Sequence, residues 1–363
     1  MNQEDLISWL SNLKPQLIKF LDQLHVNNGF YNFSLSGDII PSNIKWGLGN
    51  AVFASRIYYL LDALNKTKKK QLISFIKSFQ DEKGYIFDPV IQKRSKIRRY
   101  YHSLRYIDFP NVFNEQTRRA ETRQSFAALD SLGSRPDIPF LNLPYNPKKI
   151  KKYIDRLNWG IPWGACSHIS HLVFFIKINN RLFSVHQENA DELIHFVLDY
   201  VNQEYRQTDG SWYATSSEIP KFQKINAAMK MMTTFQSAEI EDFDKKKELI
   251  DLCLSTVNEG HACNHFNVVC VLYHCSLRTD YKKKEIQNYY LKQLEYFKSY
   301  YFEEYGGFSF LKDRASPNYY KAVITKGLNE PDIHGTFMFL WGIALITKIL
   351  KYHDIIKLNI PIT

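Results

Sequence analysis

Several features that are scarce in this chain of 363 residues narrow its class. There are five cysteines, an odd number without the spacing of a disulfide framework, so reduced thiols and a cytoplasmic location are expected. The start of the chain lacks a basic region followed by an apolar one. The longest apolar stretch, 337–349, is interrupted by Lys348 and is too short to cross a bilayer. We therefore expect a soluble protein without a transmembrane segment.

Acidic residues are outnumbered by basic ones. The chain has 47 Lys and Arg against 37 Asp and Glu, a formal charge of +10. A positive surface attracts anions, but no nucleic-acid-binding signature accompanies this charge. We expect a small-molecule or oligosaccharide ligand, itself anionic, and no nucleic acid.

Strand-like alternation is rare, and helical periodicity dominates. Apolar residues recur at three-and-four spacing in 6–24, which is typical of an amphipathic helix with one buried face. Similar stripes occur in 70–79, 190–201 and 284–302. With 45% hydrophobic residues the chain can fill one large core, so residues 1–363 are predicted to form a single all-α domain.

Between these outer helices lie six stretches that are apolar on nearly every side, and each has a polar residue near its N-terminal end. A helix of this kind must be surrounded by other helices. We therefore expect about six pairs of helices, in which outer and inner helices alternate along the chain. The inner helices are expected to surround a central cavity with polar residues at one end, its mouth. The six polar residues are Asn50, Gln124, His168, Asn226, His265 and His334.

Roles for these residues follow from their chemistry. His168 and His334 are candidates for proton transfer, because imidazole titrates near neutrality, and Asp332 is a candidate to orient a neighbouring imidazole. The others are candidates to position the ligand, although the amides could instead cap their helices. Trp163, in a Trp- and Pro-rich segment ahead of a buried helix, is a candidate rim contact. The candidates for ligand positioning are Asn50, Gln124, Asn226 and His265.

Glycine followed by an aromatic residue marks the ends of several outer helices, and it is expected to turn the chain at a positive φ. The glycines are Gly29, Gly84, Gly210 and Gly306. Residues 205–212, Tyr-Arg-Gln-Thr-Asp-Gly-Ser-Trp, resemble the Gln-Trp repeat of triterpene cyclases, and 79–85 is a weaker copy. With the alternating helices, this resembles the (α/α)6 toroid shared by terpenoid cyclases and protein prenyltransferase β subunits. The resemblance implies an enzyme with a central cavity for an anionic, partly apolar ligand.

The sequence departs from the motifs of that superfamily. Residues 332–336, Asp-Ile-His-Gly-Thr, place His334 where class II cyclases have the acid, and no Asp-Asp-x-x-Asp motif is present. Comparison with the prenyltransferases makes zinc conceivable at His261, Cys263 and His334, but position 261 is His where that family has Asp. Two alternatives stay open: a sugar-active toroid of the polysaccharide lyase or hydrolase kind, and a non-catalytic binding or scaffold protein.

Overall fold

A computed structural model describes residues 3–41, 43–113, 115–185, 189–216, 218–257 and 260–361. Within these residues the chain forms fourteen helices and three two-stranded antiparallel hairpins. The prediction of an all-α protein is confirmed. The buried hydrophobic residues form one contiguous cluster that runs from Leu6 to Ile356.

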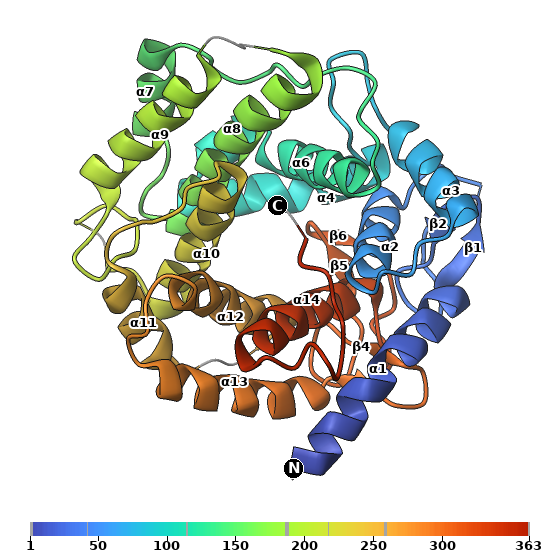
Figure 1. Cartoon of the computed structure of the whole chain (residues 1–363). Helices are drawn as coiled ribbons and strands as arrows, with labels where there is room; N and C mark the ends of the chain where they lie inside the picture. The colour runs from blue at the N-terminus through green and yellow to red at the C-terminus, as the bar shows by residue number, and fades with distance from the viewer. Residues whose placement is uncertain are drawn as a thin grey trace.

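The outer helices are amphipathic, as their periodicity predicts. In α1, Leu6, Leu10, Leu13 and Leu17 are buried while Lys19 on the other side is exposed. Figure 1 shows the outer helices along the rim of the molecule. They are α1 (Gln3–Leu24), α3 (Lys66–Lys77), α7 (Pro147–Asp155), α9 (Ala190–Tyr205), α11 (Lys246–Leu254) and α13 (Lys283–Lys298).

The inner helices are buried on almost every side. Each contacts the next one along the chain, and the last, α14, contacts the first, α2, so their contacts close into a ring (Figure 1). α14 is the one described helix that is long and apolar enough to cross a membrane, but 78% of it is buried in this ring. This agrees with the prediction of no transmembrane segment. The inner helices are α2 (Leu48–Leu60), α6 (Gln116–Ser131), α8 (Pro162–Phe183), α10 (Lys221–Ser237), α12 (Ala262–Ser276) and α14 (Ile333–Leu350).

The glycine motifs make the corners that lead from outer to inner helices. All four glycines have the expected positive φ, between 78° and 87°. A Cβ on Gly29, between β1 (His25–Asn27) and β2 (Phe30–Tyr31), would lie 2.7 Å from the Gln71 carbonyl oxygen of α3. A Cβ on Gly306, between β3 (Tyr301–Phe302) and β4 (Gly307–Phe308), would lie 2.5 Å from the Gln16 carbonyl oxygen of α1. The corner after α13 therefore packs against the first helix of the chain.

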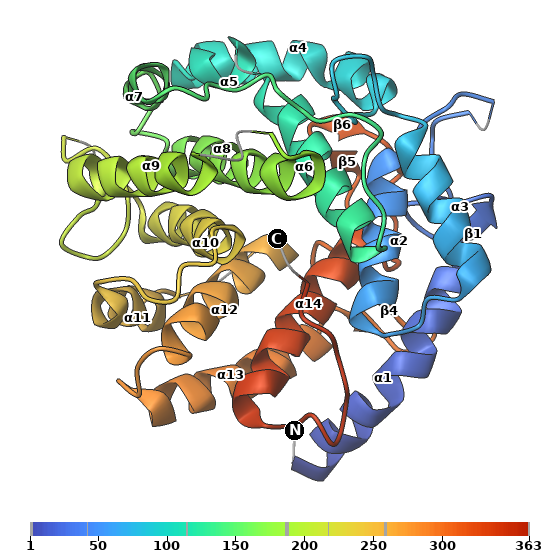
Figure 2. The ribbon, with the colours of Figure 1, turned by 45° about the horizontal axis from the view of Figure 1, so that its top comes forward.

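Two insertions meet at the end of the ring where the inner helices begin, which we call the mouth. The first, residues 89–113, is the mouth insertion and contains α4 (Pro89–Tyr106) and α5 (Phe109–Phe113). The second contains β5 (Asn318–Tyr319) and β6 (Ala322–Val323). Arg94 of α4 donates to the Val323 carbonyl oxygen at 3.2 Å, and Arg98 donates to Asn318 Oδ1 at 2.9 Å. Figure 2 shows α4 and α5 together along one side of the ring.

Residues 351–361 cross the opposite end of the ring. Asn359 pairs with the C-terminal end of α2, since its backbone amide donates to the Leu60 carbonyl and its side chain to the Tyr59 carbonyl, both at 2.9 Å. Ile356 in this segment is buried. This segment therefore packs at the end of the ring that lies away from the mouth.

Candidate functional site

A cavity extends from the mouth into the centre of the ring in two connected chambers. The inner chamber has a volume of about 530 Å³ and the outer chamber about 510 Å³. Both are lined by Arg123, Gln124, Trp163, Asn226 and Lys230, so they form one continuous space. These residues come from α6, α8 and α10.

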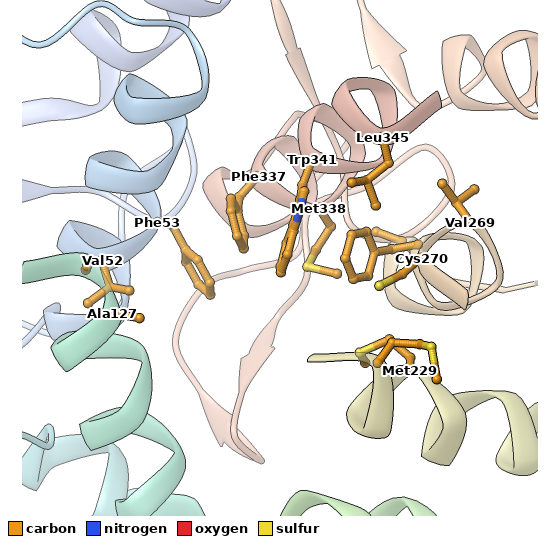
Figure 3. Packing of buried hydrophobic residues seen from close by; sticks show 14 of the residues in the cluster. Val52, Phe53, Ala127, Met229, Val269, Cys270, Phe337, Met338, Trp341 and Leu345 are labelled. Atoms are coloured by element: carbon orange, nitrogen blue, oxygen red, sulfur yellow. The ribbon is translucent and has the colours of Figure 1, made fainter. Parts of the chain in front are cut away.

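Aromatic rings make up much of the wall of the inner chamber. Phe53 of α2 and Phe337 of α14 stack with ring centroids 5.6 Å apart, and Trp341 lies 5.4 Å beyond Phe337. Figure 3 shows these rings and Met229 projecting from different helices toward one another. The three-and-four spacing of positions 334, 337, 338 and 341 along α14 places Phe337 and Trp341 on the side of that helix that lines the chamber. The wall therefore suits an apolar or unsaturated part of a ligand.

Three cations line the same inner chamber, and its lining contains no Asp or Glu of the described residues. Arg56 is only 5% exposed, and its Nε has no hydrogen-bond partner. Arg123 likewise leaves Nε and Nη2 unpaired, and its guanidinium lies 4.9 Å over the Phe174 ring. Lys230 lies 5.9 Å over Trp163. The ring thus encloses positive charge that no carboxylate of the described residues neutralises.

Burial lowers the pKa values of all three cations, and repulsion from a neighbouring cation adds to the effect for Arg123 and Lys230. Burial lowers the pKa of Arg56 to about 10. Burial, followed by repulsion from Arg56, lowers the pKa of Arg123 to about 9. Burial, followed by repulsion from Arg123, lowers the pKa of Lys230 to about 8. Folding brings the cations together at a free-energy cost, which an anion in the chamber would offset.

The outer chamber is more polar and is covered by the mouth insertion. The residues of the insertion that line this chamber include Arg99, His102, Ser103 and Asn111. Its one carboxylate among the described residues is Asp108, which accepts a hydrogen bond from Asn111 and whose pKa is raised by burial. The chamber adds amide and hydroxyl groups to the positive interior.

His334 lies in the wall of the inner chamber, between two phenyl rings. Its imidazole stacks on Phe53 and on Phe310, with 4.5 Å between centroids in each case, and His261 stacks on the far side of Phe310 at 4.9 Å. Burial lowers the pKa of His334 to about 3, so the imidazole is neutral at neutral pH. A neutral imidazole can accept a proton but cannot donate one as an acid.

His261, Cys263 and His334 all line the inner chamber. They do not meet as a metal site, because the described part of the chain contains no cluster of three His, Cys, Asp or Glu side chains close enough to hold a metal ion. Burial also raises the pKa of the Cys263 thiol to about 12, which keeps it protonated. The geometry therefore gives no support to zinc at these three residues.

His168 does not line the cavity. It is 1% exposed, and its Nε2 donates to Asn111 Oδ1 at 2.6 Å, while its Nδ1 accepts from Arg119 and from the Tyr153 hydroxyl at 2.7 Å. His171, three residues later, does line the outer chamber and accepts from Arg119 Nε at 3.3 Å. His168 thus holds α5 and α7 against α8, and the expectation that it shares the cavity with His334 is corrected.

Asp332 is also placed differently from the expectation. Its side chain caps α14 by accepting from the Gly335 amide at 2.7 Å. It also accepts from the amides of Phe310 and Ser316, at 2.8 and 2.9 Å. Burial raises the pKa of this carboxyl group to about 7, although the amides oppose the effect. The carboxylate orients backbone at the start of α14, and no imidazole of the described residues donates to it.

The predicted ligand-positioning residues divide into two groups. Gln124, Asn226 and Trp163 line both chambers. Asn50 instead donates to the Tyr31 carbonyl at 2.8 Å inside the protein, and His265 packs among the rings of α13, 4.5 Å from that of Tyr296. The set of six therefore does not converge on one mouth.

Sequence reasoning missed Lys230, Tyr320 and Phe310. Lys230 carried a signal, because it follows Asn226 by one helical turn and interrupts the apolar run of α10. Tyr320, whose hydroxyl accepts a hydrogen bond from Gln124 at 3.1 Å, and Phe310 reach the cavity from the insertion before α14. Nothing in the local sequence of that insertion predicts where it folds.

Comparison of the chain with known protein families, with curated proteins and with solved structures finds no match in any of the three. The functional argument therefore depends on the geometry and chemistry of the cavity.

Proposed function

We propose that residues 1–363 form a single (α/α)6 toroid of the terpenoid cyclase and protein prenyltransferase type. Three observations support this assignment. Six outer helices alternate with six inner ones, the inner helices contact one another in a closed order, and the corner at Gly306 packs on α1. The Gln-Trp-like segment at 205–212 lies at the corner between α9 and α10, where Arg206 and Trp212 pair as a bridge.

The proposed function is binding and conversion of an anionic ligand with an apolar, unsaturated part in the central cavity. The observation that carries this proposal is the pairing of three uncompensated cations with an aromatic wall in one chamber. Arg56, Arg123 and Lys230 would hold a phosphate or carboxylate, and Phe337 and Trp341 would contact the apolar part.

Among reactions, the cavity fits best the loss of a phosphate from an allylic ester. The C–O bond would break with its electron pair leaving on the phosphate, whose charge the two arginines stabilise. The aromatic rings would stabilise the remaining carbocation, and the neutral imidazole of His334 would accept the proton released as a new C=C bond forms. Such a reaction makes the protein a lyase, or a transferase if a second molecule captures the cation.

A sugar-active function is the second candidate, favoured by the outer chamber. Asn111, Gln116, Gln124 and Asn226 present amides there, and Trp163 offers a ring to a sugar face. The ligand would then be an anionic oligosaccharide. A non-catalytic binding protein would show the same anion affinity without turnover. Cytoplasmic location and the absence of a nucleic-acid partner stay predictions.

Isothermal titration of the purified protein with octyl phosphate, octanol and trigalacturonate separates these candidates. The proposal expects octyl phosphate to bind far better than octanol or trigalacturonate. Preference for trigalacturonate would favour the sugar-active function, and binding of none of the three would contradict the proposed ligand class. Incubation with geranyl phosphate, followed by measurement of released inorganic phosphate, tests turnover.

A further inference from the structure

The mouth insertion carries large apolar side chains that point into solvent. Ile97 is 83% exposed, Leu104 66%, Ile107 71% and Phe113 78%. Tyr100, Tyr101, Tyr106 and Phe109 are exposed beside them. A scattered apolar residue on a surface is ordinary, but this many exposed apolar residues within 97–113 indicate an interaction surface.

Four of the exposed residues share one face of α4. Positions 97, 100, 101 and 104 follow three-and-four spacing and lie on the solvent side, while Ile91, Ser95 and Ser103 face the protein. α4 contains six basic residues and no Asp or Glu; the basic residues are Lys93, Arg94, Lys96, Arg98, Arg99 and Arg105. Tyrosines and aliphatic residues flanked by Lys and Arg are the composition of helices that lie in the interface of an anionic membrane.

The same insertion covers the way into the cavity. His102 and Ser103 of α4 and Asn111 of α5 line the outer chamber, on the side away from the exposed stripe. The positive charge continues inward from Arg99 and Lys321 at the outer chamber to Arg123 and Lys230. An amphiphilic anion that leaves a bilayer beneath this surface would meet cations along the whole path.

We propose that the exposed face of α4 and α5 docks on the surface of an anionic phospholipid bilayer, which places the mouth of the cavity against the membrane. The supply of ligand from that bilayer depends on the proposed function, whereas the docking does not. The surface lies on the interface and does not span it, because the apolar stripe covers one side of a single helix. Nucleic acid is a poorer fit, since it offers nothing for Ile97, Leu104 and Phe113 to bury against.

Vesicle flotation tests the docking. The purified protein is mixed with vesicles of phosphatidylcholine alone or of phosphatidylcholine and phosphatidylglycerol. The proposal expects flotation with the anionic vesicles only, and a loss of binding at high salt because screening weakens the attraction of exposed charges. Flotation that ignores lipid charge, or no flotation with either vesicle, would overturn it.

The variant Ile97→Ser/Leu104→Ser should lower the partition coefficient by about 10-fold or more, since two apolar side chains lose their burial in the interface. The matched control is Leu141→Ser/Leu277→Ser, which replaces two leucines exposed by 48% and 52% outside the mouth insertion and should bind like the unmodified protein. Equal partition of both variants would overturn the assignment of the surface. Size-exclusion chromatography with light scattering that shows a dimer dispersed by Ile97→Ser/Leu104→Ser would assign this face to a second copy of the chain instead.

Failure of the docking can be told from failure of the proposed function. Ile97→Ser/Leu104→Ser leaves the lining of both chambers intact, so its affinity for octyl phosphate in solution should stay unchanged. Arg123→Met should lose octyl phosphate and still float with anionic vesicles.

Discussion

Replacement of Arg123 by Met should stabilise the empty protein while removing its ligand. The side chain lines the cavity inside the ring and has no carboxylate partner in the part of the chain that the structure describes, and its pKa is lowered from 12.5 to about 9. One pKa unit corresponds to about 1.4 kcal/mol, so the charged form is disfavoured by on the order of 5 kcal/mol at neutral pH, which is below both pKa values. Because Arg123 faces a cavity open to water, we expect a smaller gain, about 1 to 3 kcal/mol in the free energy of unfolding. Met can keep the apolar contact with Phe174.

Urea denaturation followed by circular dichroism measures the stability, and isothermal titration with octyl phosphate measures the binding. Loss of one cation from a buried ion pair should weaken binding by at least about 30-fold. Arg135→Met is the matched control, because Arg135 is exposed and lies 5.4 Å over the Phe183 ring outside the cavity. It should change neither quantity appreciably. An Arg123→Met protein that is less stable and binds octyl phosphate normally would refute the reasoning, since it would mean that the fold itself neutralises the guanidinium.

Four further predictions concern single residues. Affinity for octyl phosphate should fall as the pH rises through about 8, where Lys230 loses its charge, and Lys230→Met should abolish that step in titrations across this range. His334→Phe should keep the stability within about 1 kcal/mol, because a phenyl ring fits the same stack, yet stop phosphate release from geranyl phosphate; unchanged release would exclude His334 as the base. His168→Leu should lower the free energy of unfolding, measured by urea denaturation, by about 2 to 4 kcal/mol, because its buried partners lose their hydrogen bonds to the imidazole. A change below about 1 kcal/mol would contradict the structural role of His168. Gly306→Ala should lower the melting temperature much more than Gly37→Ala, since both have positive φ but only Gly306 lies against backbone of α1; equal effects would argue against that contact.

The helical class and much of the element order could be predicted from the sequence. The stripe of 6–24 corresponds to α1, and the apolar run that begins near Phe337 corresponds to α14, although that helix starts at Ile333. Burial determines these patterns directly, because a helix on the rim needs one apolar face and a helix inside the ring needs several. The mouth insertion was not predicted, because α4 is basic and exposed and lacks the pattern of a packed helix.

The candidate site was predicted less well, and the reason is geometric. A polar residue near the start of an inner helix can point to the cavity or to a neighbouring helix, and one step along the helix decides between them. On α8 the residues that face the outer chamber are Trp163, Ser167 and His171, spaced four apart, and His168 lies one step round the helix toward α6 and α7. Gln124 reaches the cavity from the middle of α6, since that helix begins at Gln116. Extending the spacing of four residues from Trp163 along α8 and from Asn226 along α10 leads to His171 and Lys230.

A crystal structure of the protein grown with octyl phosphate tests the central claim most directly. The account predicts the phosphate in the inner chamber, within hydrogen-bond distance of Arg56, Arg123 and Lys230, with the octyl chain against Phe337 and Trp341. Phosphate bound only at the outer surface, with the three cations turned toward carboxylates of the protein, would contradict it.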